Sequence, residues 1–205
     1  MIILHHLNRS RSFRILWLLE ELGLNYELRR YTRDPATNLA PQELRKLHPL
    51  GKSPMLELDG RLITESAAIV DLLCTRFAPE MIPETGTDAY VSHLEAMHFA
   101  EGSAMTPILL NLYASKLGEA AAPLQPRIRS ELSSHFNYME NDLLRPSDHF
   151  VLDQLSAADI MLSFPAEIAL RLGNGDDYPR LSGFVSDISG RPAFISAKEK
   201  AGQDI

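Results

Sequence analysis

The chain has 205 residues, of which 45% are hydrophobic, so it can bury one large core or two modest ones. Its formal net charge of -7 is too acidic for generic nucleic-acid binding, and no window reaches the ~18 uninterrupted apolar residues that a membrane span needs. The single cysteine, Cys74, excludes an internal disulfide, and the first residues lack the pattern of a signal peptide, so we expect a cytoplasmic protein.

The chain begins with a predicted strand, helix and second strand. Residues 2–6 are apolar and β-branched at their start, which predicts a strand, and the polar run Asn8–Ser12 supplies a turn and a helix cap. A helix over 13–22 is ended by Gly23, and residues 25–31 alternate as a strand does. This order within about thirty residues predicts a right-handed parallel βαβ unit.

A β-hairpin and two further helices complete the first part of the chain. Residues 41–47 predict a short helix. Apolar residues alternate over Met55–Thr64 on both sides of Asp59-Gly60, which is a strong hairpin signal, and residues 66–77 follow as a helix. The order β-α-β-α-β-β-α predicts a sheet with helices packed on it.

Residues 79–87 contain two prolines and a glycine, a composition that predicts a linker. We therefore expect domains over 1–78 and 88–205. Beyond the linker every pattern is helical. One stripe lies on a long helix that Pro107 is expected to bend; its members are Tyr90, Leu94, Met97, Glu101, Met105, Ile108 and Leu112. A second stripe has Pro126 in its first helical turn and consists of Ile128, Leu132, Phe136, Met139 and Leu143.

A capping box opens the most apolar helix of the second part. Ser156 is followed three residues later by Asp159, a variant of the pattern in which two residues cap each other at a helix start. The helix over 160–172 is apolar nearly all round and is expected to be the buried centre of this part. Two more helices are predicted over 179–188 and 192–200.

Two short segments indicate a site for an anionic peptide. Gly51-Lys52-Ser53-Pro54 leads into the hairpin, and Glu65-Ser66 ends it and opens the next helix. A strand edge offers backbone hydrogen bonds to a peptide, and a helix N-terminus favours an anion.

The chain resembles the cytosolic glutathione transferases over essentially its whole length. Five segments in the family's order carry the resemblance: Asn8–Gly23, Gly51–Pro54, Thr64–Ser66, Ser156–Asp159 and Arg191–Phe194. The resemblance implies a thioredoxin-like α/β N-terminal domain and an all-α C-terminal helical bundle. It also implies a cytoplasmic homodimer that uses glutathione.

The resemblance assigns glutathione-binding roles to residues of the two short segments. The Ser53-Pro54 bond is expected to be cis, which would turn the Ser53 backbone toward the cysteinyl residue of glutathione. Ser66 is expected to bind the γ-glutamyl carboxylate, and Glu65 the γ-glutamyl ammonium; simple helix capping is the alternative for both. Lys52 is a candidate for a glutathione carboxylate, or a solvated loop lysine.

The first loop is expected to activate the glutathione thiol. The reacting species is the thiolate, and a thiol with a pKa of about 8.5 needs a donor to be ionised at neutral pH. No tyrosine stands in this loop. The resemblance places Ser10 at the position of the serine in serine-type members, while Ser12 and Asn8 remain alternatives; Arg14 is a candidate for added positive potential or a structural ion pair.

The second substrate is expected to be a small hydrophobic electrophile bound by the helical domain. The resemblance points to the residues around Met97–Met105, and to Tyr113, as lining its pocket. Glu101 interrupts the apolar stripe; in related dimers an acid on this helix reaches glutathione in the other subunit, whereas a salt bridge or a partly exposed position are the alternatives here.

No metal or redox cofactor is expected beyond glutathione itself. His5-His6 and His93 with His98 lack the spacing of a metal site, and Cys74 lies inside a predicted helix as a core residue would. We therefore expect glutathione transfer to an electrophile. A glutathione-dependent isomerase or peroxidase of the same fold, and a non-catalytic interaction protein, remain open alternatives.

Overall fold

The computed structural model describes residues 1–173 and 175–202. The chain folds into two compact units. The first comprises Met1–Pro79 together with the segment from Ile188 onward, and the second comprises Glu80–Asp187. The first unit is mixed α/β and the second is helical, as expected from the sequence.

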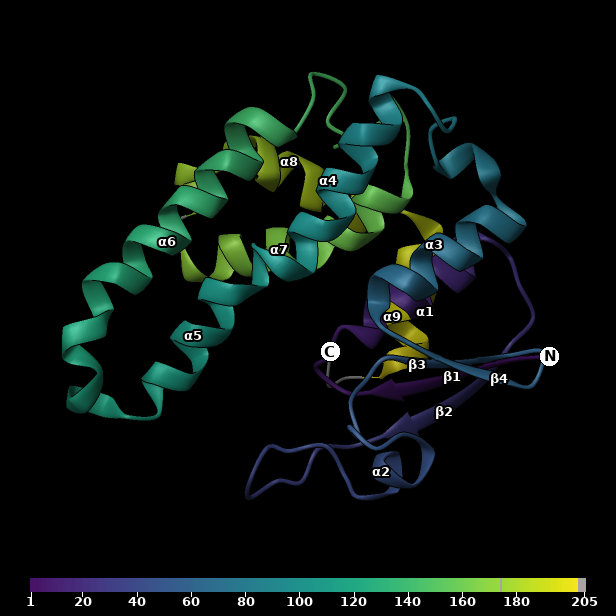
Figure 1. Cartoon of the computed structure of the whole chain (residues 1–205), viewed down its shortest axis with the longest axis horizontal. Helices are drawn as coiled ribbons and strands as arrows, with labels where there is room; N and C mark the ends of the chain where they lie inside the picture. Colours follow the sequence, from purple (N-terminus) through teal and green to yellow (C-terminus); the bar gives the residue numbers. More distant parts are fainter. Residues whose placement is uncertain (174, 203–205) are drawn as a thin grey trace. The chain divides into compact units, whose positions relative to one another are not determined.

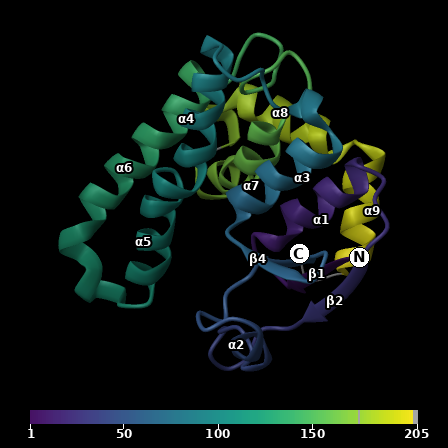
Figure 2. The same cartoon turned by 45° about the vertical axis from the view of Figure 1, so that its right-hand side comes forward.

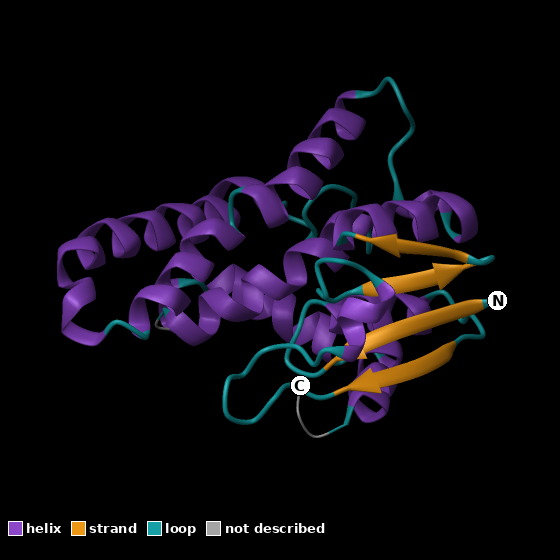
Figure 3. Cartoon of the chain, turned by 60° about the horizontal axis from the view of Figure 1, so that its bottom comes forward, coloured by secondary structure: helices purple, strands orange, loops and turns teal. Residues whose placement is uncertain are grey.

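A four-stranded sheet forms the centre of the first unit (Figure 3). Its strands are β1 (Ile2–Leu7), β2 (Glu27–Tyr31), β3 (Met55–Leu58) and β4 (Arg61–Thr64), in the order β2-β1-β3-β4. β1 pairs with β2 in parallel and with β3 antiparallel, and β3 and β4 form a hairpin. The predicted βαβ unit and hairpin are both confirmed.

Helices cover both faces of this sheet. On one face lie α1 (Ser12–Glu21), α3 (Ser66–Phe77) and α9 (Pro192–Ala201), and on the other lies α2 (Glu43–Leu47) (Figures 1 and 2). Because both faces are covered, every residue of β1 is buried. Side chains alternate along a strand, so successive β1 residues face α2 and the larger helical layer in turn.

The last helix, α9, packs against α1 within the first unit. The Phe194 ring meets the Phe13 and Trp17 rings edge-on, with centroids 5.1 and 5.2 Å away. Arg191 donates two hydrogen bonds to the Glu21 carboxylate, at 2.6 and 2.9 Å. The domain boundaries expected from the sequence are 1–78 and 88–205, with a linker over 79–87. They assign α9 to the second domain, and this division stays a proposal.

The second unit is built from helices. These are α4 (Asp88–Gly102), α5 (Met105–Ser115), α6 (Gln125–Tyr138), α7 (Ala157–Leu172) and α8 (Pro179–Ser189), the last of which continues into the first unit. Short helical turns also occur, namely η1 (Pro79–Met81), η2 (Gly118–Leu124), η3 (Met139–Leu143) and η4 (Gly175–Asp177).

The predicted capping box of α7 is confirmed. The Ser156 hydroxyl accepts from the Asp159 backbone N–H at 3.4 Å, and the Asp159 carboxylate accepts from the Ser156 backbone N–H at 2.7 Å. The same carboxylate accepts from the Phe150 N–H at 2.9 Å. Asp159 is fully buried, so it satisfies a loop and a helix end that water does not reach.

The predicted bend at Pro107 is wrong. The long helix instead breaks between Gly102 and Met105, and Pro107 is the third residue of α5. The first backbone N–H groups of a helix have no partner within it, so a proline there removes no hydrogen bond. Two members of the predicted stripe are not buried in this chain: Leu94 is 40% and Leu112 is 50% exposed.

Glu140, in η3, joins the end of α6 to the start of α8. Its carboxylate accepts from the backbone N–H groups of Arg180 and Leu181, both at 2.8 Å. In return the Arg180 guanidinium donates to the backbone carbonyls of Glu140, Leu144 and Arg145. An acid at the N-terminus of α8 is also favoured by the helix dipole, so two irregular helix ends satisfy each other.

Candidate glutathione site and first loop

The loop before β3 has the geometry that the sequence led us to expect. The Ser53-Pro54 peptide bond is cis. Gly51 has φ +56°, and a Cβ on it would lie 2.5 Å from Cγ of Arg45, so the turn requires glycine. Pro54 is buried, Ser53 is half-buried and Lys52 is exposed. The loop therefore presents Lys52 and Ser53 at the surface end of β3.

Glu65 and Ser66 form the junction between β4 and α3. Glu65 has φ 69° and ψ 119°, a left-handed conformation that costs a non-glycine residue about 1–3 kcal/mol. Its carbonyl accepts from the Ile69 N–H at 3.0 Å and so begins the helix. Ser66 is 4% exposed and is the first residue of α3, while the Glu65 side chain is exposed. Strained backbone of this kind is concentrated at functional sites.

Arg14 connects α1 to this junction. Its guanidinium is 1% exposed, and Nη2 donates to the Ser66 hydroxyl over 3.4 Å. Arg14 therefore lies behind Ser66 rather than at the surface. A buried cation beside the N-terminus of α3 adds to the positive end of the helix dipole.

The first loop folds its serines back onto the end of β1. Ser10 is 8% exposed, and its hydroxyl donates to the Leu7 carbonyl at 2.8 Å. The same oxygen lies 3.4 Å from the Ser53 hydroxyl, which brings the first loop beside the loop that contains the cis bond. Ser12 is fully buried at the start of α1, where its hydroxyl accepts from the Leu7 N–H at 3.1 Å.

A buried histidine continues this set of hydroxyl groups inward. The two hydroxyl oxygens of Ser10 and Ser12 are 2.8 Å apart, and the Ser12 oxygen lies 2.9 Å from Nδ1 of His6. His6 is 3% exposed. Burial, and secondarily the charge of the neighbouring Arg30, lower the pKa of His6 to about 4, so its ring is neutral at pH 7.

Asn8 ties the first loop to the segment that follows β2. Its side-chain oxygen accepts from the Arg33 N–H at 2.9 Å. The Arg33 guanidinium donates to the carbonyls of Asn8 and Arg9, both at 3.2 Å, and Arg9 has φ +48°. Burial, followed by the nearby charges of Arg9 and Arg11, lowers the pKa of Arg33. The hydrogen bonds from Arg33 therefore stabilise the turn at Arg9, whose positive φ is unfavourable for a residue other than glycine.

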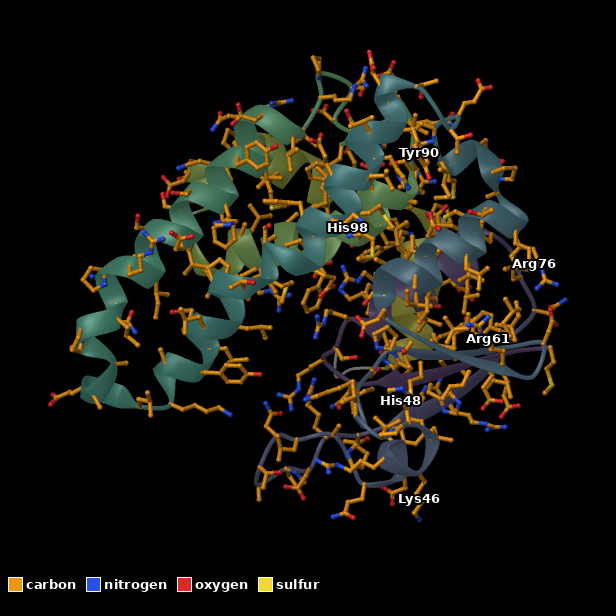
Figure 4. The ribbon with its side chains drawn as sticks, viewed as in Figure 1. Lys46, His48, Arg61, Arg76, Tyr90 and His98 are labelled. Atoms are coloured by element: carbon orange, nitrogen blue, oxygen red, sulfur yellow. The ribbon has the colours of Figure 1, made fainter. Side chains whose placement is uncertain are left out.

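The residues proposed for the second substrate lie in the helical unit. Met97 and Met105 are 5% and 3% exposed and belong to the core of that unit, whereas Tyr113 is 59% exposed. Glu101 is half-buried on α4. A cavity of about 540 Å³ lies beside α4 (His98 is labelled in Figure 4); its lining residues are Glu95, His98, Phe99, Gly102, Ser103, Tyr138 and Leu143.

Neither a metal cluster nor a membrane helix is found in the described part of the chain. Within residues 1–173 and 175–202, no three His, Cys, Asp or Glu side chains are grouped to hold a metal ion. Over the same ranges, no helix is both long and apolar enough to cross a membrane.

Two contributors to the first loop were missed in the sequence. The sequence suggests His6 only as a possible metal ligand, although strand alternation places it on the same face as Leu4 and close to the start of the next helix. No sequence pattern identifies Arg33 as a partner of the first loop, because its role depends on the distance between that loop and the segment that follows β2.

The chain matches known proteins over nearly its full length. Residues 1–73 match the family model of the glutathione S-transferase N-terminal domain. Over 98% of the chain, it is 30% identical to glutathione S-transferase 1 of Saccharomyces cerevisiae and 35% identical to glutathione S-transferase 3 of Schizosaccharomyces pombe, covering 95% and 88% of those proteins.

A solved structure agrees with these matches. The crystal structure of a glutathione S-transferase from Actinobacillus pleuropneumoniae is 36% identical, with a TM-score of 0.87, and the match covers 98% of this chain and 93% of that one. The expected thioredoxin-like domain and helical C-terminal region are therefore confirmed. The chain belongs to the glutathione S-transferase family of enzymes.

Proposed function

We propose that this enzyme binds glutathione in its first unit and conjugates the glutathione thiolate to small hydrophobic electrophiles. One observation carries the proposal: the Ser10 hydroxyl lies 3.4 Å from the Ser53 hydroxyl, at the meeting of the first loop and the loop before β3. A donor at that point is beside the backbone to which the family resemblance assigns the cysteinyl residue. Ser53 then binds that residue through its backbone, and Pro54 sets the course of the loop.

Burial favours Ser10 over Ser12 as the thiolate donor, and proximity to Ser53 favours it over Asn8. Ser10 retains 8% exposure, whereas Ser12 is fully enclosed and cannot touch a ligand without movement of the loop. Asn8 is 7% exposed, so burial does not separate it from Ser10; the 3.4 Å between the hydroxyl oxygens of Ser10 and Ser53 favours Ser10. Ser10 therefore needs only a rotation of its hydroxyl to reach a sulfur atom at the loop surface.

The free energy by which this donor must stabilise the thiolate is modest. A thiol with a pKa of about 8.5 is about 3% ionised at pH 7, and a pKa of about 6.5 raises that to about 75%. The shift corresponds to about 2.7 kcal/mol of preference for the thiolate. A hydroxyl hydrogen bond to a charged acceptor contributes about 1.5–3 kcal/mol, and the N-terminus of α1 adds its dipole.

The junction of β4 and α3 fits the γ-glutamyl end of glutathione. Ser66 offers its hydroxyl and the N-terminus of α3 to the carboxylate, supported by the buried charge of Arg14. Glu65 offers its carboxylate to the ammonium, and its left-handed backbone holds that side chain at the surface. Lys52 is exposed beside Ser53, where it suits the remaining carboxylate.

Calorimetric titration tests the binding site. Glutathione should bind the unmutated protein, and Glu65→Ala and Ser66→Ala should each weaken binding by about 10-fold or more, as expected when one charged or hydrogen-bonded contact of 1.4 kcal/mol or more is lost. Ser134→Ala, an exposed serine on α6, is the matched control. No detectable binding by the unmutated protein at millimolar glutathione would refute the proposal.

Ultraviolet absorbance of the bound thiolate tests the donor. Ser10→Ala should raise the thiol pKa in the binary complex by about 1–2 units, since about 1.4–2.7 kcal/mol of thiolate stabilisation is lost. Asn8→Ala should change binding or stability but leave the thiol pKa within about 0.3 units. An unchanged pKa in Ser10→Ala would remove Ser10 as the donor.

The reaction class needs product assays. Conjugation of an aryl halide, reduction of an organic hydroperoxide and isomerisation of a maleyl compound all begin from the same thiolate, so each should be measured on one preparation. Turnover in the first assay that Ser66→Ala lowers by about 10-fold or more at sub-saturating glutathione supports conjugation. Glutathione binding without turnover in any assay would favour an interaction protein of the same fold.

A homodimer, a cytoplasmic location and a contribution of Glu101 to the partner's glutathione site remain part of this proposal. The helix α4 carries Val91 and Leu94, which are 54% and 40% exposed, and such apolar side chains suit a subunit interface. Sedimentation should give a dimer that Val91→Glu weakens. A monomer at all concentrations would refute this part.

A further inference from the structure

We propose that His6 is a positioning residue: its Nδ1–H donates to the Ser12 hydroxyl, which donates to Ser10, so that the Ser10 proton turns toward the glutathione sulfur. This inference rests on the proposed role of Ser10 as thiolate donor. The three groups form an unbroken chain, with 2.9 Å from Nδ1 to the Ser12 oxygen and 2.8 Å from there to the Ser10 oxygen.

The direction of this chain depends on which nitrogen of His6 carries the single proton of the neutral ring. Nε2 is buried and has no hydrogen-bond partner within the described residues. A proton on Nε2 would therefore be a buried donor without an acceptor, whereas a proton on Nδ1 meets the Ser12 oxygen. Orphaned buried N–H groups are rarer than under-satisfied acceptors, so the Nδ1–H tautomer is favoured.

With the proton of His6 on Nδ1, the Ser12 hydroxyl is left with one hydrogen bond to make, the donation of its own proton. A hydroxyl oxygen has two lone pairs and one proton. Its lone pairs accept from the Leu7 N–H and from Nδ1–H of His6. Its proton must then be donated, and the Ser10 oxygen at 2.8 Å is nearer than the Leu7 carbonyl at 3.2 Å.

Assigning the lone pairs and the proton of the Ser10 hydroxyl in the same way shows that this group can donate a hydrogen bond but cannot accept another. Its oxygen accepts from the Ser12 backbone N–H at 3.2 Å and from the Ser12 hydroxyl at 2.8 Å, which uses both lone pairs. Its own proton lies on the Leu7 carbonyl at 2.8 Å in this structure and can turn to a ligand by rotation about one bond. A group that can donate but not accept favours the thiolate over the thiol.

The other tautomer would reverse the effect. If Nε2 carried the proton, Nδ1 would take the Ser12 proton, and the Ser12 oxygen could accept the proton of Ser10. The Ser10 oxygen would then have a lone pair open to a thiol S–H, which favours the neutral thiol. His6 thus determines the sign of the influence that Ser10 has on the sulfur.

The tautomer is tested first, by nitrogen NMR of the histidines in the ligand-free full-length protein. We expect the His6 resonances of a protonated Nδ1 and an unprotonated Nε2. Assignment of the His6 signals would use the loss of one ring system in His6→Leu. The opposite tautomer would overturn the proposal whatever the activity of the enzyme.

The effect on sulfur is tested in the binary complex. In His6→Leu, the thiol pKa of bound glutathione should rise by about 0.5–1 unit, which lowers the thiolate fraction at pH 6.5 by about 2- to 5-fold. Ser12→Ala, which breaks the chain at its middle, should give a rise of similar size. His6→Asn, whose amide can offer an N–H near the position of Nδ1, should restore part of the loss.

Two controls separate this inference from general damage and from the proposed function. The dissociation constant of S-methylglutathione, which has no thiol, should stay within about 2-fold in His6→Leu. In the Ser10→Ala background, His6→Leu should cause no further pKa rise; an equal rise there would overturn the chain. Ser10→Ala without effect would refute the donor and the chain together, whereas Ser10→Ala with effect and His6→Leu without effect would refute the chain alone.

Discussion

Acid should destabilise the first unit through His6 before its carboxylates are protonated. The pKa of His6 is about 6.5 in the unfolded chain and about 4 in the folded one, chiefly because the ring is buried. Between these values the unfolded state binds a proton that the folded state does not. The free energy of unfolding therefore falls as the pH falls from about 7 to 4 and does not fall further through this group below that range.

The size of this effect follows from the two pKa values. A difference of about 2.5 units corresponds to about 3 kcal/mol, with a slope that approaches about 1.4 kcal/mol per pH unit in the middle of the range. This is a substantial part of the 5–15 kcal/mol that is typical of a domain. The whole contribution is present above pH 7.

Urea unfolding of the unmutated protein and of His6→Leu at a series of pH values isolates this contribution. The only tryptophan, Trp17, is fully buried in the same unit and reports its unfolding by fluorescence. The two proteins differ only at position 6, so the pH dependence of the difference between their unfolding free energies is assigned to His6. That difference should change by about 3 kcal/mol between pH 7 and 4.

The control is His98→Leu, at an exposed position on α4 in the second unit, outside the unit whose unfolding Trp17 reports; its unfolding curves should parallel those of the unmutated protein. A His6 difference curve that stays flat within about 0.5 kcal/mol from pH 7 to 4.5 would mean that the folded protein protonates this ring as readily as the unfolded chain. The buried neutral histidine, and the tautomer argument built on it, would then be wrong.

Three other substitutions have expected outcomes. Glu140→Ala should lower the free energy of unfolding by about 3 kcal/mol in urea denaturation, because two backbone N–H groups of α8 lose a charged acceptor; an effect below about 1 kcal/mol would contradict this. Asp159→Asn should destabilise by about 2–4 kcal/mol, since an amide cannot accept all the bonds of the buried carboxylate; an unchanged melting temperature would refute the network. Glu65→Gly should raise stability by up to about 1 kcal/mol while weakening glutathione binding, because glycine relieves the positive φ and removes the carboxylate; tighter binding would overturn the role of Glu65.

The sequence was sufficient to predict those elements whose signals come from residues close together in the chain. The hairpin around Asp59-Gly60 and the helix over 66–77 were both predicted, because their turn and cap signals lie within the segment itself. The capping box of Ser156 and Asp159 was predicted for the same reason. Such signals involve neighbouring residues only.

The first loop could not be resolved in this way. Ser10, Ser12 and Asn8 are alike as local donors, and they differ only in how much of each the fold covers and in which distant group each meets. The Arg33 bond to Asn8 and the His6 bond to Ser12 each depend on the sheet bringing separate segments together. Sequence spacing carries no information on those distances.

The bend of the long helix shows a different limit. Pro107 is a strong helix breaker in a helix interior, yet it is harmless in the first turn. Which of the two applies depends on where the helix begins, and the break after Gly102 carried no comparably strong signal.

The packing of α9 on α1 has a consequence for synthesis of the chain. The Arg191–Glu21 contact joins residues that are 170 positions apart, so the core around Trp17 stays open until α9 has left the ribosome. At about 5–20 residues per second, this interval is on the order of 10–30 seconds. The nascent first unit therefore exposes an apolar helix face throughout that time, and chaperones that bind such faces have their main opportunity before the last helix emerges.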